Sequence, residues 1–144
     1  MPENAFPLEE IYPILCEVIA SGGEFRLFPR GTSMKPLLRE GVDSVALVAP
    51  AGYRRGDILL YRRPNGNFVL HRLMQVEKDG TLTFCGDNQS LLEKGVSPEA
   101  VIARVSAVYR GEKRISFTSL RYRLYKASAI SKPLRALRIW RKLY

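Results

Sequence analysis

The sequence predicts a mainly β domain with one helix before its sheet and a basic helix after it. Three observations lead to this prediction. Apolar residues recur at helical spacing near the start, about six short runs rich in Val, Ile, Leu, Phe and Tyr follow, and the last segment carries basic residues but no acidic one. We therefore divide the 144 residues into an amphipathic helix (1–23), a β body (24–112) and a basic helical tail (113–144).

The first helix is predicted over residues 8–21, where apolar side chains form one face. These side chains are Leu8, Ile11, Tyr12, Leu15, Val18 and Ile19. The "SGG" at residues 21–23 then ends the helix, because glycine readily adopts the backbone conformation that closes a helical segment.

The β body is predicted from apolar runs that turn residues separate. The runs are "FRLFPR", "VDSVALVA", "GDILLYRR", "NFVLHRLMQVE", "TLTFCGD" and "VIARVSAVYR". Pro64-Asn65-Gly66 predicts a hairpin between the third and fourth runs, because Asn and Gly tolerate the positive φ of tight turns. Lys78-Asp79-Gly80 predicts the next hairpin in the same way. We expect a mostly antiparallel sheet.

The tail is predicted to contain an amphipathic helix that starts at Ser131, with Pro133 in its first turn. At about 100° per residue, one side of this helix carries Ala136, Leu137, Ile139, Trp140, Leu143 and Tyr144. The other side carries Arg135, Arg138, Arg141 and Lys142, and Leu134 breaks the partition. Helical spacing continues less regularly upstream, through Leu120, Leu124 and Ala127.

The positive charge of the chain is concentrated in this tail. The formal net charge is +9, yet every acidic residue lies at or before Glu112. Such asymmetry indicates an anionic partner. In one interpretation the helix lies on an anionic membrane surface, with Trp140 and Tyr144 among the headgroups. In the other, its apolar face packs on the β body or on a second subunit. Nucleic acid is disfavoured, because few aromatic residues alternate with the arginines.

The remaining composition argues against several classes of protein. No apolar run approaches the ~20 residues that span a bilayer, and the acidic N-terminus is unlike a secretory signal. We expect a cytoplasmic protein, peripheral to the membrane if the tail binds lipid. Cys16 and Cys85 are expected to be reduced and structural. The single histidine has no nearby cysteine or second histidine, so no metal and no cofactor is expected.

Four residues are candidates for catalysis. Ser33 lies in "RGTSMKP", a glycine- and proline-bracketed turn, and a serine nucleophile needs a base such as His71. Asp87 or Glu93, which follow the next strand, would orient the imidazole. Each residue also has an ordinary interpretation taken singly: a turn serine, a packed histidine, a turn aspartate and a solvated glutamate.

The order of these blocks resembles the signal peptidase I superfamily of serine peptidases, which includes the LexA-type self-cleaving repressors. The blocks are "GTSMKPLLREGVDSVALV", "RRGDILLYRR", "VLHRLMQV" and "TFCGDNQSLLEKGVSPEAVIARV", which span about residues 24–110. The resemblance implies a mostly β body of coiled sheets. It also implies proteolysis by a serine nucleophile.

The superfamily pairs its serine with either a lysine or a histidine on a later strand. Here that strand reads "FVLHRLM" and has no lysine, so the chain resembles the Ser-His branch. The resemblance then makes Ser33 the nucleophile and His71 the general base. Asp87 occupies the first acidic position of that branch, and Glu93 replaces the second aspartate, which leaves the orienting carboxylate open.

The oxyanion and substrate contacts are assigned to the same turn. Some relatives carry a hydroxyl two residues before the nucleophile, where this chain has Gly31. We therefore expect backbone donors or Thr32 to bind the oxyanion, and we assign Thr32 and Met34 to the oxyanion and substrate contacts.

The function expected from this resemblance is serine endopeptidase activity on a leader or signal-like segment of a peptide or protein substrate. Family members that cut signal peptides generally carry a transmembrane helix, which this sequence lacks. The alternative is a non-catalytic binding or regulatory module on the same scaffold, or a protein that binds anionic surfaces through its tail. The sequence does not indicate the oligomeric state.

Overall fold

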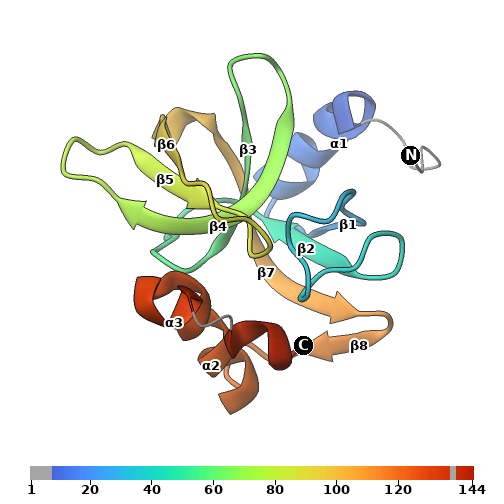
Figure 1. The fold of residues 1–144 in the computed structure, drawn as a ribbon. Helices are drawn as coiled ribbons and strands as arrows, with labels where there is room; N and C mark the ends of the chain where they lie inside the picture. Colours follow the sequence, from blue (N-terminus) through green and yellow to red (C-terminus); the bar gives the residue numbers. More distant parts are fainter. Residues whose placement is uncertain (1–7, 137–138) are drawn as a thin grey trace.

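The computed structural model describes residues 8–136 and 139–144, in which a mainly antiparallel sheet lies between an N-terminal and a C-terminal helix (Figure 1). The fold class predicted from the sequence is confirmed at this level. The helices are α1 (Leu8–Ala20), α2 (Leu120–Ile130) and α3 (Lys132–Ala136), with short turns η1 (Pro98–Ala100) and η2 (Ile139–Lys142). The strands are β1 (Phe25–Leu27), β2 (Ser44–Val48), β3 (Ile58–Arg62), β4 (Phe68–Val76), β5 (Leu82–Cys85), β6 (Glu93–Val96), β7 (Val101–Arg110) and β8 (Lys113–Ile115).

Within the described residues, eight strands form one strongly curled sheet in the order β1-β2-β7-β3-β4-β5-β6, with β8 paired to β7 (Figure 1). Every strand pair is antiparallel. The two predicted hairpins are confirmed: β3 pairs with β4 and β4 with β5, through turns in which Gly66 has φ 92° and Gly80 has φ 89°. These hairpins fix the register of β4, the strand that carries His71.

Two strands, β6 and β8, were not predicted. β6 begins at Glu93, carries exposed Lys94 and Gly95, and is an edge strand, so it lacks the apolar alternation that marks a half-buried strand. β8 has only three residues and is mostly exposed. Because β8 pairs with β7, the sheet extends beyond residue 112, where the β body was predicted to end.

The curled sheet separates two apolar clusters among the described residues. The larger cluster lies on one face of the sheet and includes Leu15 and Ile19 of α1 and Tyr122, Tyr125 and Ala129 of α2. The smaller cluster lies on the other face, and its members are Leu59, Tyr61, Val69, Leu73, Leu82, Phe84 and Val96. Neighbouring residues of β4 therefore point into different clusters, as strand geometry requires.

The N-terminal helix agrees with the prediction, ending at Ala20 rather than Ser21. Gly22, with φ 87°, follows it, and the Gly23 N–H donates to the Val18 carbonyl (2.9 Å). Cys16 of α1 is half-buried and Cys85 of β5 is buried, and both thiols are free.

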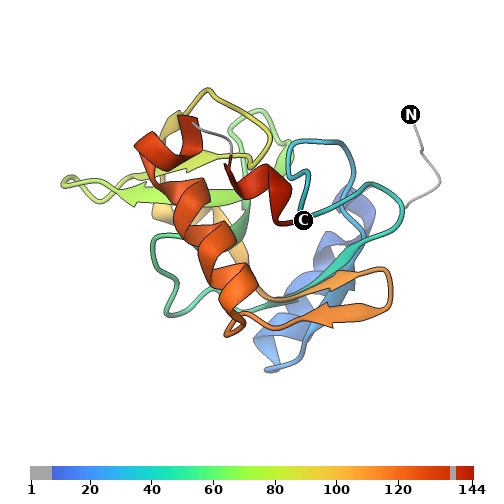
Figure 2. The same ribbon diagram turned by 60° about the horizontal axis from the view of Figure 1, so that its bottom comes forward.

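The prediction of one amphipathic helix from Ser131 to the end of the chain is wrong. α3 starts at Lys132, with Pro133 in its first turn as expected, but ends at Ala136, and η2 is a separate short turn. Figure 2 shows both folded back beside α2. The side of the helix was also predicted for Leu137, Arg138, Ile139 and Trp140, whose side chains lie outside the part of the chain that the structure describes.

The packing of the tail on the body explains this correction. Leu143 and Tyr144 pack against the main cluster, and the Tyr144 ring lies 5.2 Å from that of Tyr125. Arg135, predicted on the basic side of the helix, contacts the loop after β5. The helical spacing predicted through Leu120, Leu124 and Ala127 is confirmed as α2. The buried residues of this helix are Tyr122, Tyr125, Ser128 and Ala129, whereas Leu120 and Leu124 are exposed.

Across residues 8–136 and 139–144, no helix combines the length and the apolar character needed to cross a bilayer.

Candidate active site

The turn that carries Ser33 connects β1 to β2 and is held by the loop after β5. The Asn88 N–H donates to the Ser33 carbonyl (2.8 Å), and the Asn88 side-chain amide donates to the Thr32 carbonyl (3.1 Å). The Asp87 N–H points at the Met34 sulfur (3.4 Å). The "GDN" loop therefore positions the predicted nucleophile through three consecutive residues of its turn.

Gly86 makes this close approach possible. A Cβ atom at residue 86 would lie 2.6 Å from the Ser33 carbonyl oxygen, a distance that backbone atoms do not tolerate. The glycine is required here for space, and the loop would move away from the serine turn if residue 86 had a side chain.

The three residues predicted in the serine turn differ in environment. Ser33 is half-buried, Thr32 is exposed, and Met34 is buried in the main cluster. Ser33 and Met34 line a cavity of about 270 Å³, which we call the serine cavity. Met34 therefore both anchors the turn in the core and forms part of the cavity wall.

His71 lines the same serine cavity from β4. It is 5% exposed, and burial, with the nearby Arg63 guanidinium, lowers the pKa of His71 to about 4. The imidazole is therefore neutral at pH 7 and able to accept a proton.

Tyr61 connects His71 to Glu93. The Tyr61 hydroxyl donates to Glu93 Oε1 (2.7 Å) and lies 3.4 Å from His71 Nδ1. A hydroxyl that donates to a carboxylate presents its lone pairs elsewhere, here toward the imidazole. The arrangement favours the tautomer with the proton on Nδ1, which leaves the Nε2 lone pair as the basic site.

Arg63 completes this group, because its guanidinium forms an ion pair with Glu93 (2.9 Å) and lines the serine cavity. Hydrogen bonds from Arg63 hold the pKa of the Glu93 carboxyl below its usual value. Burial, with the Glu93 carboxylate, raises the pKa of the Tyr61 hydroxyl, which keeps it protonated. We call Tyr61, Arg63, His71 and Glu93 the histidine network.

Asp87 belongs to a second group on the opposite face of β4. Both of its oxygens accept from Arg72 (2.8 Å each), and Oδ2 also accepts from the Tyr125 hydroxyl (2.7 Å). Arg72 and Asp87 are both 0% exposed. Burial lowers the pKa of the Arg72 guanidinium, but Asp87, Tyr122 and Tyr125 together raise it well above its usual value. We call Arg72, Asp87 and Tyr125 the arginine network.

The tail reaches the loop that holds Ser33. Arg135 of α3 donates to the carbonyls of Gly86 (2.6 Å) and Gln89. Arg141 of η2 donates to the side-chain oxygen of Asn88 (2.8 Å). Because Asn88 in turn binds Thr32 and Ser33, the tail supports the turn that carries Ser33 through one intermediate residue.

The structure therefore brings Ser33, Met34 and His71 to one cavity and links Glu93 to His71 through Tyr61. Asp87 is held by the arginine network, beside the loop that supports Ser33. Tyr61 and Arg63 were missed from the sequence. Tyr61 could have been predicted from the Asn65-Gly66 turn. A hairpin with this turn pairs Leu59 with His71, and Tyr61 is then the diagonal neighbour of His71.

Among the described side chains, no cluster of three or more His, Cys, Asp or Glu residues is arranged to hold a metal ion. Comparison of the whole chain with protein-family models, with curated proteins and with solved structures finds no match.

Proposed function

We propose that this protein is a serine endopeptidase of the signal-peptidase type, which cleaves a leader or signal-like segment from a peptide substrate. The observation that carries the proposal is that Ser33 and His71 line one cavity while His71 is kept neutral. The proposal includes the coiled β fold of that superfamily, with which the curled antiparallel sheet agrees.

In the proposed mechanism the Ser33 hydroxyl attacks the scissile carbonyl carbon and His71 Nε2 accepts its proton. Backbone N–H groups of the serine turn stabilise the oxyanion. His71 then protonates the leaving amine, which breaks the C–N bond and leaves an ester on Ser33. A water molecule, deprotonated by His71, hydrolyses this ester and restores the serine.

The histidine network supports both states of the base. The Tyr61 oxygen accepts a hydrogen bond from Nδ1–H and so holds the ring. The Glu93 carboxylate, which accepts from Tyr61, favours the positive charge that develops on the ring. An imidazole with a pKa near 4 is free to accept a proton at pH 7 but is a weaker base than one that titrates near 7. The carboxylates of Glu93 and Asp87 raise the pKa of His71 and so partly offset the lowering by burial and Arg63.

Substrate is expected to bind in an extended conformation. β1 forms one edge of the sheet, and a groove of about 790 Å³ runs along it and adjoins the serine cavity. Its lining is mostly apolar but includes Arg26, Arg30 and Arg63. A peptide that pairs with this edge would place alternate side chains in the groove. We propose a cytoplasmic location. The packing of Leu143 and Tyr144 on the core favours docking of the tail on the body over insertion among lipid headgroups.

A fluorophosphonate probe tests the proposal, with the adduct measured by intact-mass spectrometry. We expect wild type to gain one adduct, Ser33→Ala to gain none, and His71→Ala to react at least about 100-fold more slowly. Ser21→Ala, which removes an exposed serine just after α1, is the matched control and should react like wild type. Equal labelling of wild type and Ser33→Ala would exclude Ser33 as the nucleophile.

A second candidate function is a non-catalytic peptide-binding module on the same scaffold. It is favoured by the ion pairs of Glu93 with Arg63 and of Asp87 with Arg72, which direct both candidate carboxylates toward arginines. The module predicts that wild type, Ser33→Ala and His71→Ala are alike in failing to react and yet bind the same peptides.

A further inference from the structure

The residues next to Ser33 offer an oxyanion no side-chain donor at the serine cavity. Gly31 has no side chain, Met34 has no N–H or O–H group, and Thr32 is exposed and is not among the described residues that line this cavity. Sites of this kind usually combine two donors, and loss of a side-chain donor slows the reaction by about 10²- to 10³-fold. A second donor is therefore expected from another wall of the cavity.

Gln89, in the loop after β5, lines the serine cavity together with Ser33 and His71. Among the described residues of this lining, Gln89 alone has a side-chain amide, a neutral group with two N–H donors. The cationic donors of the lining are Arg30 and Arg63, and the Arg63 guanidinium is already held in an ion pair. Within residues 8–136 and 139–144, no hydrogen bond engages the Gln89 amide, so its donors are available to a ligand.

The Gln89 amide lies beside the main chain of Ser33, across Gly86. From the position that a Cβ at residue 86 would occupy, the Ser33 carbonyl oxygen lies at 2.6 Å, Gln89 Oε1 at 2.9 Å and Gln89 Cδ at 3.2 Å. Both groups therefore share the space that the missing side chain of Gly86 leaves. Because Oε1 is turned toward Gly86, the NH₂ end of the amide is turned away from it.

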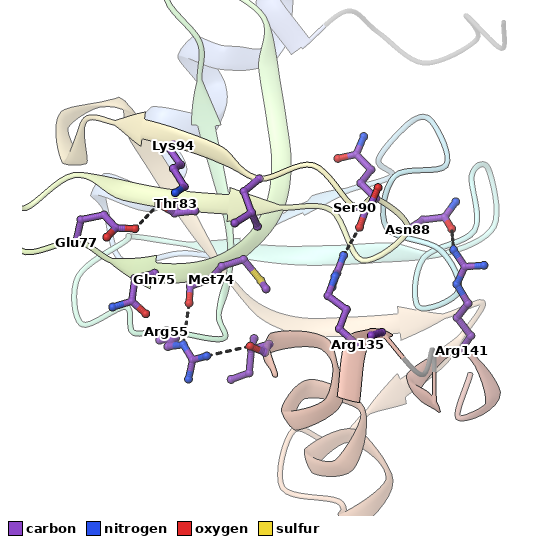
Figure 3. Close-up of a pocket in the computed structure, with 14 residues that line it drawn as sticks. Arg55, Met74, Gln75, Glu77, Thr83, Asn88, Ser90, Lys94, Arg135 and Arg141 are labelled. Carbon is purple, nitrogen blue, oxygen red and sulfur yellow. Dashed lines mark hydrogen bonds between the residues drawn. The ribbon is translucent and has the colours of Figure 1, made fainter. Parts of the chain in front are cut away.

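The backbone that carries this amide is fixed. The Gln89 N–H donates to the Gly86 carbonyl (2.9 Å), and Arg135 of the tail donates to the carbonyls of both residues. Figure 3 shows Arg135 and Arg141 reaching from the tail to the loop segment that contains Asn88. A donor on a fixed backbone needs little reorganisation when charge develops on the substrate.

We infer that Gln89 is a catalytic residue of the proposed peptidase, whose side-chain amide donates a hydrogen bond to the oxyanion. The inference rests on the proposed function. As Ser33 Oγ bonds to the carbonyl carbon, the π electrons of the C=O bond move to its oxygen, and the Gln89 amide stabilises this charge without transferring a proton. When the C=O bond re-forms and the C–N bond breaks, the charge leaves the oxygen and the hydrogen bond weakens.

Gln89→Met tests the inference, because methionine keeps the length of the side chain and removes its N–H donors. Gln75→Met makes the same change at an exposed position of β4 and is the matched control. The rate constant for labelling of Ser33 by the fluorophosphonate is measured by intact-mass spectrometry. The phosphoryl oxygen of the bound probe takes the place of the oxyanion, so ³¹P NMR of the finished adduct reports on the same hydrogen bond.

We expect Gln89→Met to slow labelling about 100-fold and Gln75→Met to leave the rate constant unchanged. Gln89→Glu places a carboxylate beside the oxyanion and should label more slowly than Gln89→Met at pH 7. The ³¹P signal of the adduct should shift in Gln89→Met and not in Gln75→Met. Because Gln89 is exposed, its variants should keep the wild-type urea midpoint, which separates the loss of a donor from damage to the fold.

Labelling of Gln89→Met at the wild-type rate would overturn the inference, and so would an unshifted ³¹P signal. Slow labelling of Arg30→Gln beside fast labelling of Gln89→Met would overturn it in favour of Arg30 as the second donor. The two proposals fail separately. A wild type that labels, with no effect of Gln89→Met, leaves the peptidase and removes this donor, whereas a wild type that does not label removes both.

Discussion

His71 and Arg72 are neighbours on β4, and they anchor two networks that use the same kinds of side chain. Each network combines a basic residue of β4 with a carboxylate and a tyrosine: His71 with Glu93 and Tyr61, and Arg72 with Asp87 and Tyr125. They differ in access to solvent. Arg72 and Asp87 are fully buried, whereas the side chains of Glu93 and Arg63 are 29% and 37% exposed beside an open cavity.

His71 is itself buried, so the difference between the networks is that the histidine network borders a cavity and the arginine network does not. The arginine network links β4, the loop after β5 and α2, and no substrate can reach it. The histidine network has weaker restraints and opens onto the serine cavity. We therefore expect damage to the first to appear in stability and damage to the second in rate.

The largest expected effect is on stability, from Asp87→Asn. Loss of the carboxylate charge leaves the Arg72 guanidinium buried without its counterion, and we expect the free energy of unfolding to fall by about 3–5 kcal/mol. Urea denaturation followed by circular dichroism measures the change. Glu93→Gln is the matched control in the other network and should lower the free energy of unfolding by no more than about 1 kcal/mol, because its ion pair is partly exposed. Equal losses would remove the distinction between the networks.

The next effect concerns pH and the neutral imidazole. Because the pKa of His71 falls from 6.5 in the unfolded chain to about 4 in the fold, the unfolded chain takes up a proton first. Stability from this residue is complete above about pH 6.5 and is lost as pH falls to about 4, by up to about 3 kcal/mol. His71→Gln should lack this component. As His71 is the only histidine, one imidazole NMR signal reports its pKa, and a midpoint near 6.5 would contradict the prediction.

A smaller effect, on rate, is expected from Tyr61→Phe. Removing the hydroxyl takes away the acceptor for the Nδ1 proton of His71, and we expect labelling of Ser33 by the fluorophosphonate to slow about 10- to 100-fold. The apparent pKa of the labelling rate should also change, which a purely structural role would not cause. Tyr125→Phe makes the same change in the arginine network and should lower stability while leaving the labelling rate of the folded protein unaltered.

The smallest effect is expected at the support that the tail gives to the nucleophile turn. Arg141→Gln removes the charged contact to Asn88, and we expect labelling of Ser33 to slow about two- to threefold with little change in the urea midpoint. Arg123→Gln, on an exposed position of α2, is the matched control. If both variants label at the wild-type rate, the tail does not position the turn.

Much of the sheet was predictable because local turn chemistry determines it. Asn65-Gly66 and Asp79-Gly80 identified two hairpins, and with them the neighbours of β4. β6 was missed because an exposed edge strand carries no alternating pattern. The tail was predicted as a single amphipathic helix, since periodicity records which residues are apolar but not what they pack against. Tyr144 and Arg135 are oriented by contacts with the body, distant in sequence.

The proposed reacting groups of the candidate site were predictable, but the residues that support them were not. Ser33 and His71 were identified from residue type and order, and they line one cavity. The choice between Asp87 and Glu93 depended on which side chains approach them in space. Asp87 meets Arg72 and Tyr125 from two other elements, and Glu93 reaches His71 only through Tyr61.

Gly86 gives the two networks a common dependence. Because Gly86 has no side chain, the loop can approach the Ser33 carbonyl oxygen, from which a Cβ at residue 86 would lie only 2.6 Å. The next residue, Asp87, belongs to the arginine network. A methyl group at residue 86 would push the loop away from the turn that carries Ser33 and would displace the buried Asp87 carboxylate from Arg72. A Gly86→Ala substitution would therefore disturb the turn that carries Ser33 and the arginine network at the same time.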